Sequence, residues 1–175
     1  MKMQLGIVTI LFAASAAVAR ADAPQVGDKA PDFKLQASDG KEYSLAQFAG
    51  KKPVVIAWFP KAFTGGYTAQ CKSMKEDGAA IRQFDVAYFT ASVDDVQKNT
   101  DFAKSLSLDY PILSDPTKKT AEAYGVVHAG RPVAERWTFY IGPDGVVKAV
   151  DQKVNTKEHA NDIARQLEAL GVPKK

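Results

Sequence analysis

One short segment, residues 60–71, combines residue types that could support chemistry at the start of a helix. It reads Pro-Lys-Ala-Phe-Thr-Gly-Gly-Tyr-Thr-Ala-Gln-Cys and directly follows an apolar run. A helix that begins near Tyr67 would direct free backbone N–H groups at the turn, which favours an anion or developing negative charge. Such an environment lowers the pKa of a thiol and so favours the reactive thiolate. The residue at the start of this helix is Tyr67 and not a cysteine. A phenol with an ordinary pKa of about 10 is a poor substitute for a thiolate.

Cys71 is the only cysteine of the chain, so no intrachain disulfide can form. It lies one helical turn after Tyr67 and therefore on the same helix face. Two interpretations stay open for it: a small buried hydrophobe, or a thiol that forms mixed disulfides and reacts slowly with oxidants. We expect His128 and His159 to lie at the surface, and neither forms a metal-ligand cluster with Cys71 by spacing. The sequence thus predicts no metal site and no cofactor.

The elements around this segment alternate between strands and helices. Residues 53–59 are a continuous β-branched and aromatic run, typical of a central strand that is buried on both faces. Two hairpins are predicted, one at the Asp-Gly turn after residues 32–37 and one at Gly142–Gly145. The other predicted elements, in chain order, are a short helix capped by Ser44, a helix over 67–84, a strand over 85–93, a helix from Asp94-Asp95 to about 106, a strand over 110–113, a helix opened by Asp115-Pro116, and a helix from Thr156 to about 170. This order predicts an α/β sandwich with a mixed sheet.

The N-terminus has the pattern of a secretory signal peptide. Lys2 precedes the uncharged run over residues 5–19, and small residues frame cleavage sites after Ala21 or Ala23. The sequence therefore predicts a signal peptide over 1–23, a folded domain over 24–175 and an exported protein, periplasmic or secreted. The alternative is a retained membrane anchor. A net charge of +3 without a stripe of basic and aromatic residues argues against nucleic-acid binding.

Several segments together make the chain resemble the peroxiredoxins of the AhpC/TSA superfamily. They are Val26–Phe33 (VGDKAPDF), Trp58–Lys61 (WFPK), Thr64–Gly66 (TGG) and Arg136–Ile141 (RWTFYI). The chain is most similar to the bacterioferritin-comigratory, or PrxQ-like, branch, and the resemblance covers essentially all of residues 24–175. It implies a thioredoxin-like sandwich, with a central mixed sheet flanked by helices and an N-terminal β-hairpin extension.

The family's active site reads Pro-x-x-x-Thr-x-x-Cys, with an arginine from a later strand. The resemblance places Pro60, Thr64 and Arg136 in this site, Tyr67 at the peroxidatic cysteine (or selenocysteine) position, and Cys71 where some members carry a resolving cysteine. The hydroxyl of Thr64 would contact the peroxide, the Arg136 guanidinium would hold a thiolate or peroxide oxygen, and Pro60 would shield the site from water. None of these groups replaces the missing sulfur.

The resemblance implies an exported thiol-dependent peroxidase that reduces hydrogen peroxide or organic hydroperoxides. Its partners would be the hydroperoxide and an external dithiol reductant such as a thioredoxin-like protein, with no stable membrane insertion after signal cleavage. Because of Tyr67, we expect weak or absent turnover from the chain as written. The alternatives are a non-catalytic thioredoxin-fold binding protein and a copper-delivery redox protein. Whether the protein is a monomer or a dimer stays open.

Overall fold

The longest apolar run becomes the middle of the sheet. In the computed structural model, which describes residues 23–175, every residue of β3 (Val54–Trp58) is buried. β3 pairs in parallel with β4 (Ala87–Ser92) and antiparallel with β6 (Thr138–Ile141). The signal peptide predicted over residues 1–23 lies, except for its last residue, outside the described residues.

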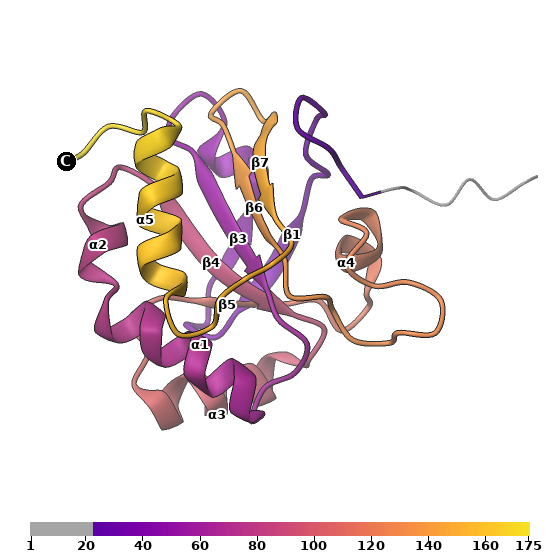
Figure 1. The fold of residues 1–175 in the computed structure, drawn as a ribbon. Helices are drawn as coiled ribbons and strands as arrows, with labels where there is room; N and C mark the ends of the chain where they lie inside the picture. Colours follow the sequence, from indigo (N-terminus) through magenta and orange to yellow (C-terminus); the bar gives the residue numbers. More distant parts are fainter. Residues whose placement is uncertain (1–22) are drawn as a thin grey trace, which may run out of the picture.

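The seven strands form one mixed sheet in the order β2-β1-β5-β4-β3-β6-β7 (Figure 1). The strands not yet given are β1 (Lys34–Ala37), β2 (Glu42–Ser44), β5 (Ile112–Ser114) and β7 (Val147–Asp151). β1 and β2 form the predicted N-terminal hairpin, and β1 joins it to the sheet by pairing with β5. β6 and β7 form the second predicted hairpin. This arrangement is the predicted α/β thioredoxin-like fold.

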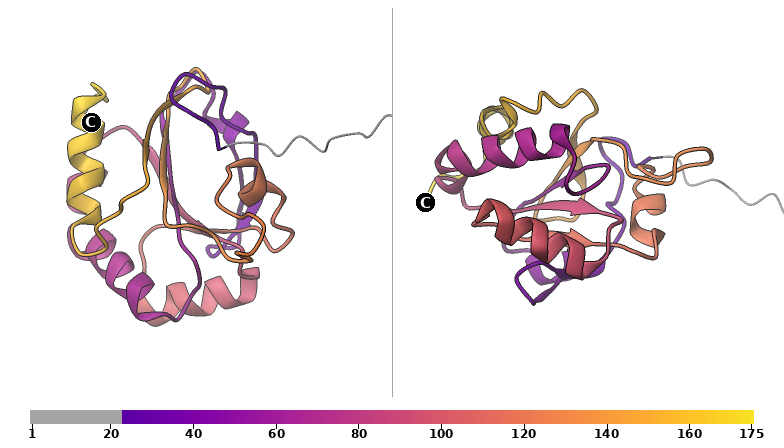
Figure 2. Two further views of the ribbon diagram at one scale, coloured as in Figure 1. Left: turned by 45° about the vertical axis from the view of Figure 1, so that its right-hand side comes forward. Right: turned by 90° about the horizontal axis from the view of Figure 1, so that it is seen from below.

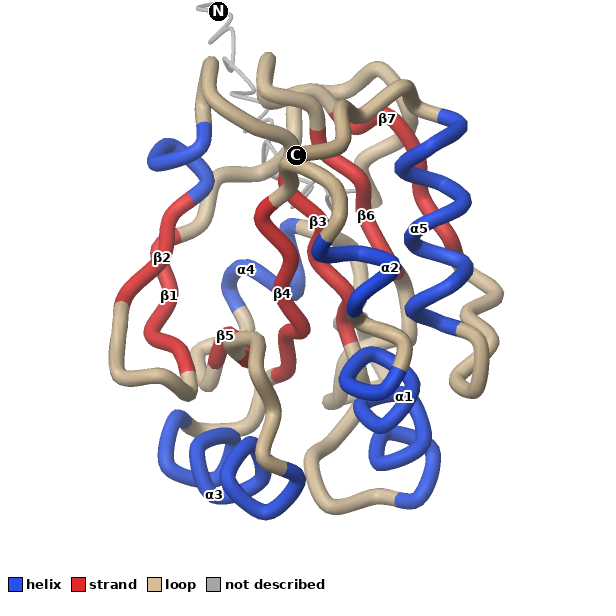
Figure 3. Tube along the Cα trace, turned by 90° about the vertical axis from the view of Figure 1, so that its left-hand side faces the viewer, coloured by secondary structure: helices blue, strands red, loops and turns tan. Residues whose placement is uncertain are grey.

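Helices cover both faces of the sheet (Figure 2). They are η1 (Leu45–Phe48), α1 (Gly65–Glu76), α2 (Ala79–Arg82), α3 (Val96–Leu106), α4 (Lys119–Ala123) and α5 (His159–Ala169). One apolar cluster joins residues of α1, α2, α3 and α5 to one face, while a second cluster joins α4 and the N-terminal segment to the other face. α1, α2 and α5 lie side by side over the first face (Figure 3). The candidate site therefore belongs to the first cluster.

Three predicted helix boundaries are wrong. The helix predicted over 67–84 is divided into α1 and α2 at Asp77-Gly78. A Cβ at position 78 would lie 2.3 Å from the Met74 carbonyl oxygen, and glycine is also a weak helix former. α4 starts at Lys119, after a turn at Pro116, and α5 starts at His159 rather than at Thr156. Each of these helices is preceded by a turn that the sequence pattern did not separate from it.

Among residues 23–175, no helix is long and apolar enough to span a membrane.

Candidate active site at the start of α1

The side chain of Tyr67 is part of the core. It lies in the first turn of α1 and is fully buried. Its ring stacks on Phe59, with centroids 3.2 Å apart and an angle of 6° between the planes, and also contacts Phe102. Its hydroxyl shares a hydrogen bond of 3.0 Å with Oγ1 of Thr90. Burial raises the pKa of Tyr67 well above 10, so the phenol stays neutral.

Cys71 is also buried, on the same face of α1. Burial raises the pKa of its thiol to about 12, and the nearby hydroxyls of Tyr110 and Tyr67 and the charge of Arg136 offset only part of this rise. A thiol in this state is protonated at neutral pH and reacts slowly. Cys71 therefore has the character of a small core residue while α1 is folded.

The guanidinium of Arg136 lies against the first two turns of α1. Its Nη1 donates a hydrogen bond to Oε1 of Gln70, which lies between positions 67 and 71. A Cβ at position 66 would lie 3.3 Å from Nη2 of Arg136, so the glycine allows this close approach. Arg136 precedes β6 rather than beginning it. The sequence-predicted residues Arg136, Tyr67 and Cys71 are thus brought together.

Arg136 is a half-buried cation without a carboxylate partner among residues 23–175. Burial lowers its pKa, and the neighbouring Tyr67 and Cys71 act in the opposite direction. A guanidinium remains charged in proteins even so. Its charge is therefore available to an anion at the start of α1.

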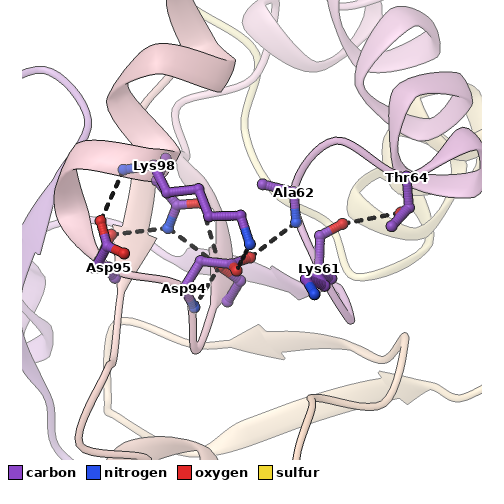
Figure 4. Close-up of polar contacts among 9 residues, drawn as sticks. Lys61, Ala62, Thr64, Asp94, Asp95 and Lys98 are labelled. Atoms are coloured by element: carbon purple, nitrogen blue, oxygen red, sulfur yellow. Dashed lines mark hydrogen bonds and ion pairs between the residues drawn. The ribbon is translucent and has the colours of Figure 1, made fainter.

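Thr64 lies at the N-cap position of α1, but its side chain does not cap the helix. It is exposed, and its hydroxyl donates to the carbonyl oxygen of Lys61 at 2.9 Å (Figure 4). The hydroxyl of Thr64 is thus hydrogen-bonded within the β3–α1 loop. Pro60 is partly buried at the start of the same loop.

Asp94 fixes the β3–α1 loop, a role that no pattern in the sequence indicates. Its Oδ2 accepts a hydrogen bond of 2.8 Å from the backbone N–H of Ala62, and its Oδ1 pairs with Lys98 at 2.5 Å (Figure 4). Phe63, which follows Ala62, is exposed and has a φ of 61°, a strained value for an aromatic residue. The carboxylate of Asp94 stabilises this unfavourable loop conformation.

Behind Arg136, a chain of hydrogen bonds runs through buried side chains. Gln70 Nε2 lies 3.0 Å from Nδ1 of His159, and His159 Nε2 lies 2.9 Å from Oγ1 of Thr138. The prediction that His159 lies at the surface is wrong, since it is fully buried. His159 shares one face of α5 with the apolar residues Ile163 and Leu167, four and eight residues later. This spacing is the sequence signal that indicates a buried position.

The other predicted surface histidine, His128, is exposed and lies 3.2 Å from Glu135. Arg131 contacts the same carboxylate at 2.9 Å. Within residues 23–175, no group of three or more His, Cys, Asp and Glu side chains is placed to bind a metal ion.

Comparisons with known proteins identify the family. The AhpC/TSA family model matches residues 26–150. A putative peroxiredoxin bcp from Coxiella burnetii is 31% identical over 149 residues, which covers 82% of this chain and 98% of the relative. One from Haemophilus influenzae is 32% identical over 151 residues, which covers 83% and 97% of the two chains.

Solved structures agree with this similarity. The crystal structure of peroxidoxin BcpB from Mycobacterium tuberculosis has a TM-score of 0.75 at 27% identity and covers 84% of this chain and 98% of its own. A cysteine-to-serine mutant of PrxQ from Xylella fastidiosa has a TM-score of 0.77 over 86% and 99% of the two chains, and at 20% identity it supports the fold alone. The chain therefore belongs to the AhpC/TSA family, in its Bcp/PrxQ-like peroxiredoxin branch.

Proposed function

We propose that this chain is an exported peroxiredoxin-type protein whose reacting position is residue 67, and that Tyr67 leaves it with little or no peroxide turnover. The observation that supports this most is the position of Arg136. Its guanidinium lies at the first turns of α1 without a carboxylate partner among the described residues. A cation there would stabilise a thiolate at position 67 and the charge that develops on a peroxide oxygen.

With a thiol at position 67, the arrangement supports a balanced redox cycle. The thiolate attacks one peroxide oxygen, the O–O bond breaks, and the other oxygen leaves as hydroxide or alkoxide and takes a proton. The sulfur becomes a sulfenic acid. The thiol of Cys71 then attacks this sulfur, water leaves and a disulfide forms, which an external dithiol reduces back to two thiols.

The disulfide step requires α1 to open. Side chains at i and i+4 of a helix have Cβ atoms roughly 5–6 Å apart, whereas a disulfide needs roughly 3.5–4.5 Å. The high pKa of buried Cys71 points in the same direction, because the thiol must reach a more polar environment to ionise.

A phenol cannot perform the first step of this cycle. Tyr67 is neutral, its hydroxyl is hydrogen-bonded to Thr90, and its ring fills the space between Phe59 and Phe102. The side chain therefore supplies no nucleophile and occupies the volume that a peroxide would need.

The test compares hydrogen peroxide consumption by three proteins, with dithiothreitol or a thioredoxin as reductant: the unaltered chain, Tyr67→Cys, and Tyr67→Ser. The serine variant removes the aromatic ring without adding sulfur. We expect catalytic consumption from Tyr67→Cys only. A folded Tyr67→Cys protein without activity, or equal activity in the unaltered chain, would contradict the proposal.

Export is the second component of the proposal, and it depends on the signal-peptide pattern at residues 1–23. With cleavage after Ala21 or Ala23, the mature protein would carry no retained anchor and would act in the periplasm or outside the cell. A thioredoxin-like dithiol protein of that compartment would then be the reductant.

The charge of Arg136, which no carboxylate among residues 23–175 neutralises, also favours a second candidate function, non-catalytic binding of an anionic ligand or partner. Two results together would favour this binding function over the peroxidase-type function: an anion binds to the unaltered chain but not to Arg136→Gln, and Tyr67→Cys shows no peroxide turnover. The copper-delivery alternative receives less support, because both ring nitrogens of His159 and both of His128 already have protein partners.

A further inference from the structure

Three elements are linked behind the candidate site by one chain of side-chain hydrogen bonds. It starts at Arg136, passes through Gln70 of α1 and His159 of α5, and ends at Thr138 of β6. Gln70, His159 and Thr138 are all fully buried. No water competes for these groups, so each hydrogen bond fixes the orientation of the next side chain.

The direction of every hydrogen bond in this chain follows from Arg136. A guanidinium only donates, so the Gln70 atom that faces it must be the amide oxygen. The amide nitrogen of Gln70 then donates to Nδ1 of His159, which must carry the lone pair. The ring proton is consequently on Nε2, which donates to the hydroxyl of Thr138. One tautomer of His159 satisfies all partners.

The side chains that follow Arg136 in this chain of hydrogen bonds are all electrically neutral. Burial and the charge of Arg136 lower the pKa of His159 to about 3, and its place at the start of α5 disfavours a cation further. Gln70 carries no charge either. The charge of Arg136 is therefore not neutralised from behind, as a carboxylate at position 70 would do, and it stays directed at the first turns of α1.

We propose that His159 is a positioning residue: through Gln70 it holds the guanidinium of Arg136 in place to stabilise an anion at position 67. This inference rests on the proposed function of position 67. The role of His159 is one of orientation and not of proton transfer.

The experiment uses the Tyr67→Cys, Cys71→Ser protein, whose single thiol is at position 67, and measures the pKa of that thiol from the pH dependence of its alkylation. His159→Phe removes the link to Gln70, and Thr138→Val removes the hydroxyl that accepts from Nε2 of His159 and fixes the orientation of its ring. Ser73→Ala is the matched control. It removes another hydrogen bond between α1 and α5, in which the N–H of Ala160 donates to Oγ of Ser73 at 3.3 Å. This hydrogen bond is not connected to Arg136, Gln70, His159 or Thr138.

We expect His159→Phe and Thr138→Val each to raise the thiol pKa by about one unit, as for loss of a neighbouring opposite charge, and Ser73→Ala to leave it unchanged. A folded His159→Phe or Thr138→Val protein with an unchanged thiol pKa would overturn the inference. If the His159→Phe protein does not fold, Thr138→Val decides.

Nitrogen NMR of the unaltered chain gives an independent check, since it reports the tautomer directly. The inference requires the proton on Nε2 of His159, and a proton on Nδ1 would overturn it. Failure of the proposed function looks different: the tautomer and the pKa shifts would be as expected, but the thiol at position 67 would not react with peroxide.

Discussion

Single residues decide whether this site can react. Tyr67 contributes an aromatic ring to the core at the position where a reacting atom is expected, while Arg136 supplies a positive charge that no carboxylate of the described residues neutralises. The two residues make opposite contributions: the first fills and closes the site, and the second keeps it suited to an anion. The stability of the protein and its potential reactivity therefore depend on different side chains.

The first prediction concerns the contribution of Tyr67 to stability. Tyr67→Phe leaves the Thr90 hydroxyl without its partner and should lower the free energy of unfolding by about 1 kcal/mol. Tyr67→Ala also loses the stacking on Phe59 and Phe102 and should cost about 3–5 kcal/mol. Urea unfolding measures both. Tyr43→Phe, which loses an exposed hydrogen bond to Asp39, is the control with a cost below about 0.5 kcal/mol. Equal costs for Tyr67→Phe and Tyr67→Ala would show that the ring is not packed as described.

The second prediction concerns pH and His159. The unfolded chain protonates this histidine near its ordinary pKa of 6.5, whereas the folded protein does so only at about 3. Between these values the unfolded state binds more protons, so stability falls as the pH falls, by up to about 1.4 kcal/mol per pH unit. Urea unfolding between pH 7 and pH 4 should show a shallower loss in His159→Phe than in the unaltered chain. Parallel curves would show that His159 titrates normally in the folded protein.

The sequence predicted only part of the site at this scale. Tyr67, Cys71 and Arg136 could be grouped because they belong to a recognisable motif. Gln70 and His159 could not, since they are 89 residues apart and their hydrogen bond exists only after α5 packs on α1. Thr64 lies in the motif, but a local bond to Lys61 directs its hydroxyl elsewhere.

At the scale of elements, the β3–α1 loop positions the start of α1. Its conformation includes Phe63 with a positive φ, which costs on the order of 1–2 kcal/mol for a residue with a side chain. The hydrogen bond from the Ala62 N–H to Asp94 and the ion pair of Asp94 with Lys98 offset this cost. The loop is therefore held from the start of α3, a neighbouring element, and not by its own residues alone.

The third prediction tests this support. Asp94→Ala removes the acceptor of the Ala62 N–H, so hydrogen exchange of the loop amides should become faster, and the free energy of unfolding should fall by about 1–3 kcal/mol. Asp95→Ala is the matched control: Asp95 caps α3 through the Lys98 N–H at 2.8 Å. Its loss should cost about 1 kcal/mol and leave exchange in the loop unchanged. Equal exchange in the loops of both variants would contradict the role given to Asp94.

Strands were predicted more accurately than helix boundaries, for a physical reason. β3 and the two hairpins are specified by local signals, namely a continuous apolar run and turns that contain glycine. The division between α1 and α2 depends on Gly78 and its close approach to Met74, which the periodic pattern of the segment does not reveal. The start of α5 likewise depends on where the helix packs.

At the scale of the whole molecule, the order of elements was sufficient to predict the fold. Parallel pairing of β3 with β4 follows from the α1–α2 crossover, and antiparallel pairing of β6 with β7 follows from their hairpin. The sheet then separates two apolar clusters, and the one beneath α1 contains both Tyr67 and Cys71. The site is thus part of the core and cannot react without access to it.

The fourth prediction concerns export. Expression of the full chain in a Gram-negative bacterium, followed by mass spectrometry of the periplasmic fraction, should give a protein that begins at Asp22 or Pro24. A charged residue placed in the apolar run, as in Ile10→Lys, should keep the full-length chain in the cytoplasm. Recovery of an uncleaved chain in the membrane fraction would favour the retained anchor instead.

The most direct test of the account measures how fast hydrogen peroxide oxidises the thiol at position 67 in the Tyr67→Cys, Cys71→Ser protein, with and without Arg136→Met. We predict a fast reaction that slows at least about tenfold, and by about 100-fold if the guanidinium acts as a full transition-state donor. Equal rates for the two folded proteins would contradict the claim that Arg136 prepares this position for an anion.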